Sequence, residues 1–119
     1  MSIKYNMPRK SKITQAPPAA VKETLERLGR HIRTARVRRK LPQDGLARRI
    51  GVSRFVVADM EKGKPSTGIA AYLGALWALG LLEDMRAVAD PDRDEEGKTL
   101  ERARSPKTAG RARALSDDF

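Results

Sequence analysis

The sequence predicts an all-α protein with five helices in its first 90 residues. Apolar residues recur at steps of three and four, and proline and glycine divide the chain into helix-sized segments. A chain of 119 residues is long enough for one modest core. We therefore expect a single domain over residues 17–90. A flexible basic arm (residues 1–16) and a charged, largely flexible tail (residues 91–119) flank it.

The first helix is expected to begin near Pro17 and to end near Lys40, because proline suits a first helical turn. Pro42 cannot continue it, since proline lacks an amide proton and restricts the residue before it. The helix carries one apolar stripe at steps of four, three, four and three residues: Val21, Leu25, Leu28, Ile32 and Ala35.

Two short helices joined by a three-residue turn come next, at about Gln43–Ile50 and Ser53–Lys62. Gly51 can take the left-handed conformation that ends the first of them. Ser53 is a good N-cap for the second. The turn is expected to set the two helices at a sharp angle.

The remaining helices are predicted from apolar spacing. Residues 63–68 have the composition of a loop. A shorter fifth helix is expected at about Leu82–Ala89 and a frayed helix at Glu95–Arg104. The fourth helix is expected to bury an apolar stripe that consists of Ile69, Leu73, Leu76, Trp77 and Gly80. Tyr72 is expected near the edge of this stripe.

The charge indicates a polyanionic partner. The formal net charge is +10, and most of the lysine and arginine residues precede residue 65, whereas residues 65–100 are net acidic. Nucleic acid is the first candidate; an anionic membrane surface or an acidic protein comes second. There is no cysteine, no signal-peptide pattern and no apolar run that could span a membrane, so we expect a cytoplasmic protein without a membrane partner.

Catalysis is not expected. His31 is the only histidine and has no acidic residue three or four positions away. Gly63-Lys64 is not a phosphate loop, because Pro65 occupies the Ser/Thr position and Ala58 stands where an earlier glycine is needed. The sequence therefore predicts no enzyme activity, no metal and no cofactor.

The two short helices meet the requirements of a helix-turn-helix. In that motif the second helix protrudes into the major groove while the first braces it. Ala47 allows the helices to approach closely, and Gly51 supplies the turn. The apolar anchors are Leu46, Ile50, Val52, Val57 and Met60.

Residues 43–64, QDGLARRIGVSRFVVADMEKGK, resemble the helix-turn-helix of Cro/CI-type repressors, the xenobiotic-response-element family. The resemblance covers roughly Leu28 to Leu82. It implies a five-helix, lambda-repressor-like DNA-binding domain that acts as a homodimer on double-stranded DNA with a pseudo-palindromic operator. Gly45 departs from the family pattern, where glutamate is common, and costs its helix about 1 kcal/mol of propensity.

The resemblance also implies roles for individual residues. Gln43 and Ser53 would hold phosphate, and Lys62 and Lys64 would contact the DNA backbone. Arg54, Phe55 and Asp59 would lie on the recognition helix, where bases are contacted. Arg36 and Glu61 match a pair that is largely buried in this family.

The residue types themselves suggest further roles. Arg54 matches the two major-groove acceptors of guanine, with a phosphate contact as the alternative. Phe55 and Val56 would face thymine methyl groups, or else pack against a neighbouring helix. Asp59 would be repelled by phosphate unless it accepts from a cytosine amino group. Several basic residues could contact the DNA phosphates. Among them, Arg39 and Lys40 at the end of the first helix are the strongest candidates.

Two other surfaces have alternative interpretations. The basic arm is either solubilising or lies along DNA, in a minor groove or on the backbone. The second surface forms a dimer interface or closes the core of the monomer, and it consists of Leu81, Leu82, Met85 and Val88.

The C-terminal extension, residues 79–107, resembles that of HipB-type antitoxins, which are paired with a HipA-like kinase toxin. This resemblance implies a repressor of transcription that also binds a toxin, through the acidic segment or the terminal residues 115–119. There are two alternatives. The protein could be an autonomous regulator without a toxin, or a basic module that binds an acidic protein instead of DNA.

Overall fold

The computed structural model describes residues 11–104, and this part of the chain is all-α, without a strand. Its helices are α2 (Lys12–Gln15), α3 (Ala19–Arg38), α4 (Gln43–Ile50), α5 (Arg54–Glu61), α6 (Ile69–Leu79), the 3-10 helices η1 (Glu83–Ala87) and η2 (Pro91–Arg93), and α7 (Glu95–Arg104). The predicted helices corresponding to α3 through α6 and to α7 are confirmed, with ends that shift by at most a few residues.

The structure consists of two compact units that meet in the sequence between Leu82 and Glu83. The first contains α2 to α6 and the second contains η1, η2 and α7. The expected domain boundary near residue 90 stays a prediction. No helix in residues 11–104 is both long enough and apolar enough to cross a bilayer.

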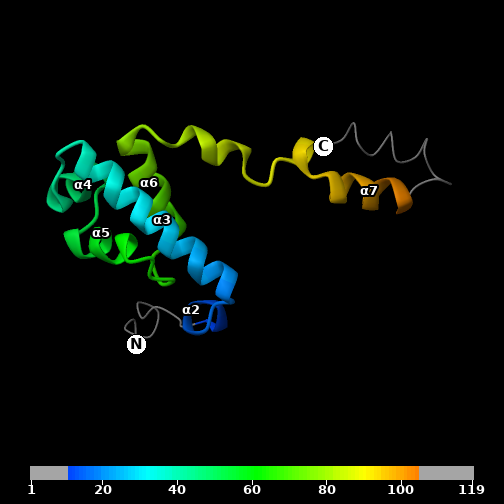
Figure 1. Cartoon of the computed structure of the whole chain (residues 1–119), viewed down its shortest axis with the longest axis horizontal. Helices are drawn as coiled ribbons and strands as arrows, with labels where there is room; N and C mark the ends of the chain where they lie inside the picture. The colour runs from blue at the N-terminus through cyan, green and yellow to red at the C-terminus, as the bar shows by residue number, and fades with distance from the viewer. Residues whose placement is uncertain (1–10, 105–119) are drawn as a thin grey trace, which may run out of the picture. The chain divides into compact units, whose positions relative to one another are not determined.

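One core joins the four packed helices of the first unit. α3 and α4 each pack against α5 and α6, and α5 also contacts α6 (Figure 1). Each of the four contributes at least one side chain that is almost completely buried: Ile32, Leu46, Val57, Met60 and Tyr72. The expected anchors Leu46, Val57 and Met60 are thus confirmed, whereas Ile50 and Val52 are half-buried.

The backbone of α3 touches the end of α5. A Cβ atom added at Gly29 would lie 2.5 Å from the carbonyl oxygen of Met60 and 2.6 Å from that of Glu61. A Cβ at Gly63 would lie 2.6 Å from the Cα of Glu26. The helices approach this closely because both contact positions lack a side chain.

The predicted stripe of α6 is partly wrong. Ile69 and Trp77 are 64% and 63% exposed, while Tyr72 is 2% exposed and belongs to the core. The buried face consists of Tyr72, Ala75, Leu76 and Leu79. α6 contains no charged residue, so its apolar spacing could not indicate which face is inside.

The stripe of α3 is buried only in its second half. Ile32 and Ala35 are buried, Leu25 and Leu28 are half-buried, and Val21 is 38% exposed. The prediction that Val21 belongs to the buried stripe is therefore wrong. Helical spacing places these residues on one side of α3, but the other helices cover only part of its length.

The fifth helix of the bundle does not form as an α-helix. Its residues make the 3-10 helix η1 in the second unit, and Ala89 then has a left-handed φ of 60°. A residue in that conformation ends a helix, so no α-helix continues through Ala89. The expected helix at Leu82–Ala89 is corrected to one short 3-10 segment.

The predicted arm also contains structure at its end. Residues 1–10 lie outside the described residues, but Lys12–Gln15 form α2. The Ser11 hydroxyl accepts from the Thr14 amide at 3.4 Å, and the Thr14 hydroxyl accepts from the Ser11 amide at 3.1 Å. This capping box defines a single polar turn, which apolar periodicity does not detect.

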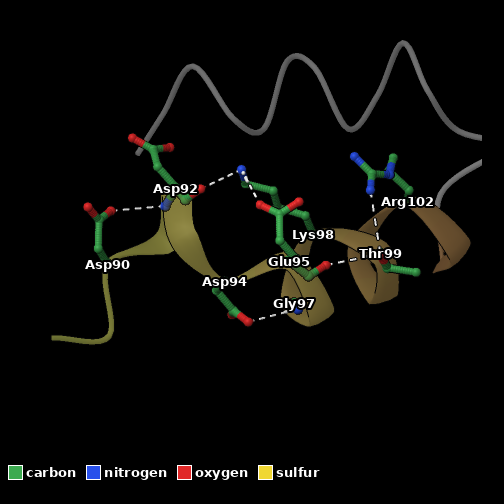
Figure 2. Close-up of polar contacts among 8 residues, drawn as sticks. All are labelled: Asp90, Asp92, Asp94, Glu95, Gly97, Lys98, Thr99 and Arg102. Atoms are coloured by element: carbon green, nitrogen blue, oxygen red, sulfur yellow. Dashed lines mark hydrogen bonds and ion pairs between the residues drawn. The ribbon is translucent and has the colours of Figure 1, made fainter. Parts of the chain in front are cut away.

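The second unit is held by polar contacts near the start of α7 (Figure 2). The Asp94 carboxylate accepts from the Gly97 amide at 2.9 Å. Lys98 Nζ donates to the Asp92 carbonyl oxygen at 2.6 Å and pairs with Glu95 at 3.1 Å. No residue of η1, η2 or α7 is buried, so this unit depends on local hydrogen bonds more than on a core.

We expect Gly29→Ala to destabilise the first unit by about 1–3 kcal/mol, because the new Cβ meets backbone atoms that cannot rotate away. Gly74→Ala is the matched control. Its Cβ would lie 3.5 Å from Ile50, an ordinary contact, and alanine raises helix propensity by about 1 kcal/mol. Urea unfolding followed by circular dichroism measures both; equal stability of the two variants would contradict the close α3–α5 contact.

Candidate nucleic-acid interface

The turn between α4 and α5 has the geometry that its sequence predicts. Gly51 has a left-handed φ of 76° and ends α4, and the Val52 amide donates to the Ala47 carbonyl at 3.0 Å. The Ser53 hydroxyl accepts from the Val56 amide at 3.4 Å and caps α5. The expected roles of Gly51 as helix end and Ser53 as N-cap are confirmed.

The first residues of α5 face solvent. Phe55 is 67% exposed and Arg54 is exposed, whereas Val57 and Met60, further along the helix, are completely buried. The expected outward position of Phe55 is confirmed. Val56 is half-buried, so part of its surface packs on the protein.

A buried ion pair holds the other end of α5. Arg36 Nε donates to Glu61 Oε2 at 2.6 Å, and Arg36 Nη2 donates to Glu61 Oε1 at 3.0 Å. The two side chains are only 10% and 3% exposed. A third bond joins Arg36 Nη1 to the Leu41 carbonyl oxygen at 2.9 Å. The predicted ion pair is confirmed, and it joins α3 to the end of α5.

Gln43 extends this network, which the sequence did not indicate. Its side-chain amide donates to Glu61 Oε1 at 3.0 Å. The start of α4 is thereby fastened to the end of α5, and Glu61 accepts from both Arg36 and Gln43. The phosphate contact expected of Gln43 stays a prediction; in the free protein its side chain has this structural partner.

Asp59 has a partner on its own side of α5. Its carboxylate pairs with Lys64 Nζ at 3.2 Å, with side chains that are 40% and 51% exposed. The Lys64 amide also donates to the Asp59 carbonyl at 3.1 Å. Both residues are predicted DNA contacts, and the sequence does not predict their contact with each other. Their spacing of five, across the end of a helix, gives no periodic signal.

Tyr72 supports the loop that carries Lys64. Its hydroxyl donates to the Lys64 carbonyl oxygen at a distance of 3.4 Å, which is long for a hydrogen bond. Burial raises the pKa of the Tyr72 phenol above its usual value of 10.0. The Tyr72 hydroxyl therefore stays protonated, and able to donate, throughout the physiological range.

The other residues expected to contact the DNA backbone are exposed basic residues near the ends of helices. Lys62 forms the C-cap of α5. Arg39 ends α3 and donates from Nη1 to the Ala35 carbonyl oxygen at 2.9 Å. Lys40 follows with a left-handed φ of 53°, which directs the chain from α3 toward α4. Their contacts with phosphate remain predictions.

The residues expected at a dimer interface belong to both units. Leu81 and Leu82 end the first unit, and Met85 and Val88 lie in the second. Leu81 and Val88 are 43% and 61% exposed, and the other two are half-buried. In the described residues, no group of three or more His, Asp or Glu side chains is placed to hold a metal ion.

A family model described as a helix-turn-helix domain matches residues 27–89, more than half of the chain. The matched region includes most of α3 and all of α4, α5 and α6. Comparison with curated proteins and with solved structures finds no match.

We expect Arg36→Met to destabilise the first unit by about 3–5 kcal/mol, because it leaves the Glu61 carboxylate buried without its cation. Gln43→Ala removes one bond to a charged group and should cost about 1.5–3 kcal/mol. The matched control is Arg38→Met, on the exposed side of α3, with an expected change within about 0.5 kcal/mol. Urea unfolding measures all three, and equal losses for Arg36→Met and Arg38→Met would show that the pair does not hold the fold.

Proposed function

The chain belongs to the helix-turn-helix domain family, and from this premise we propose that it is a cytoplasmic, sequence-specific DNA-binding repressor of the Cro/CI type. The observation that carries the proposal is the two-sided character of α5. One face is completely buried at Val57 and Met60, and the start of the helix exposes Arg54 and Phe55 to solvent. A helix anchored and exposed in this way can enter a major groove without unfolding its support.

The proposed contacts fall into two classes. Arg54 reads guanine with its two parallel donors, and no ion pair among the described residues engages its guanidinium. Contacts to phosphate come from the groups around the motif, which position the protein without reading sequence. These groups are Gln43, Ser53, Lys62, Lys64, Arg39 and Lys40.

Asp59 is proposed to control Lys64 instead of reading a base. Its carboxylate lies 3.2 Å from Lys64 Nζ, so in the free protein each charge is partly neutralised by the other. A DNA phosphate competes with Asp59 for this ammonium group. The pair therefore reduces the attraction of the motif for any duplex, whatever its sequence.

A homodimer on a pseudo-palindromic operator is the proposed assembly. Leu81, Leu82, Met85 and Val88 supply apolar surface that a monomer leaves at least partly exposed, and Trp77 on α6 adds a large exposed side chain. Two copies of a chain with a net charge of +10 repel each other, and apolar contacts of this kind would offset that repulsion.

We further propose that the second unit binds a HipA-like kinase toxin, which makes the protein an antitoxin and the repressor of its own gene pair. The support is the separate unit of η1, η2 and α7, which is rich in Asp and Glu and exposes Val88 and Leu100. Co-purification of the full chain with the product of an adjacent kinase-like gene tests this step. Failure to co-elute would leave an autonomous regulator.

Selection from a random duplex library with the full chain tests the proposed function. The expected result is a two-fold symmetric consensus. Arg54→Ala should relax the preference for one guanine per half-site, at a cost of about 1–3 kcal/mol in discrimination. A basic protein-binding module would instead give no consensus at any ionic strength. An unchanged base preference in Arg54→Ala would refute direct reading by this residue.

We expect Asp59→Asn to strengthen binding to all duplexes by about two- to fivefold, because Lys64 is released to phosphate. Lys64→Ala should weaken all of them and flatten the slope of log affinity against log salt by about one unit. Glu23→Gln, at an exposed acidic position on α3, removes the same charge as Asp59→Asn and is the matched control. Fluorescence anisotropy over a salt series measures the three variants. If Asp59→Asn and Glu23→Gln changed the affinity for DNA equally, the Asp59–Lys64 ion pair would have no role in binding. If Asp59→Asn instead lost the preference for one cytosine, Asp59 would be a base contact.

A further inference from the structure

Arg54 and Phe55 contact each other at the start of α5. The guanidinium carbon of Arg54 lies over the Phe55 ring, 5.2 Å from its centroid. Consecutive residues of a helix point about 100° apart, so this contact requires both side chains to turn toward each other. The attraction between a guanidinium and an aromatic face stabilises that arrangement. The two residues are therefore one composite surface, which we call the Arg54–Phe55 pair.

The contact leaves both members of the pair open to a ligand. The guanidinium carbon of Arg54 lies over the face of the Phe55 ring, and no ion pair among the described residues engages Arg54. The Arg54 donors are therefore available. Phe55 is 67% exposed, so its ring is also open to a ligand.

Placed in a major groove, the pair is long enough to span two neighbouring base pairs. An arginine that donates twice to guanine lies near the plane of that base. Base pairs are spaced by about 3.4 Å, and the Phe55 centroid lies 5.2 Å from the guanidinium carbon, so the ring can reach the base pair next to that guanine.

We propose that the Arg54–Phe55 pair recognises a guanine next to a pyrimidine that carries a C5-methyl group. The methyl group is the apolar feature that a base pair presents in the major groove, and an apolar side chain such as phenylalanine is its natural partner. Thymine and 5-methylcytosine carry the same group in the same place. This inference rests on the proposed function, because it names the base step that the same site reads.

The test uses the full chain and the duplex found by selection. The guanine is the one whose preference Arg54→Ala relaxes. At the adjacent pyrimidine, four duplexes are compared by fluorescence anisotropy: thymine, uracil, 5-methylcytosine and cytosine. Thymine and uracil differ only by the methyl group, as do the two cytosines, so each comparison isolates one group.

We expect each methyl group to increase affinity by about fourfold, the value of burying one such carbon. Phe55→Ala should remove both differences while its fold, measured by thermal melting, is retained, because the ring is exposed. Val37→Ala on α3, an exposed apolar residue outside the motif, should keep both differences. A response to thymine alone, or to 5-methylcytosine alone, would assign the recognised base.

Three results would overturn the inference while leaving the proposed function intact. They are a selected duplex with no pyrimidine beside that guanine, equal binding with and without the methyl groups, and methyl dependence that persists in Phe55→Ala. Absence of any preferred duplex for the wild-type chain is a different result. It would refute the proposed function itself, and this inference with it.

Discussion

The contact between α3 and the end of α5 is the constraint on which the candidate site depends. The backbones meet at Gly29, where a Cβ would collide with the Met60 and Glu61 carbonyl oxygens. Nearby, the Arg36–Glu61 pair joins the same two helices through two hydrogen bonds. α5 is therefore held at its C-terminal end. Its N-terminal end can project, with Arg54 and Phe55 exposed, without loss of position.

In this arrangement apolar groups stabilise the packing of α5, and polar groups fix its position. Val57 and Met60 bury the inner face of α5 and supply most of the favourable free energy of its packing. The buried ion pair adds little net stability, because removing both charges from water offsets their attraction. Its value lies in geometry: Glu61 accepts from Arg36 and Gln43 at once, so α3, α4 and α5 are fixed at one point. A displacement of α3 relative to α5 breaks the bonds between Arg36 and Glu61, which are buried away from water.

The sequence predicts the local structure well and the non-local contacts less well. Gly51, Ser53 and the ends of α4 follow from turn and cap chemistry, and the Arg36–Glu61 pair followed from family resemblance. The apolar spacing of α6 wrongly predicts a buried Trp77, because a helix without charged residues has no polar face to reveal its orientation. The contacts of Gln43 with Glu61 and of Asp59 with Lys64 depend on how the helices pack. No spacing in the sequence encodes them.

The most direct test of the projecting helix is an NMR titration of the isotope-labelled full chain with the selected duplex. If α5 enters the groove, the largest changes in amide shift will occur between Gly51 and Val56 and at the start of α4. The buried face of α6 will change little, because the bundle binds as a rigid support. Changes confined to α6 or α7, with residues 51–56 unaffected, would contradict the account.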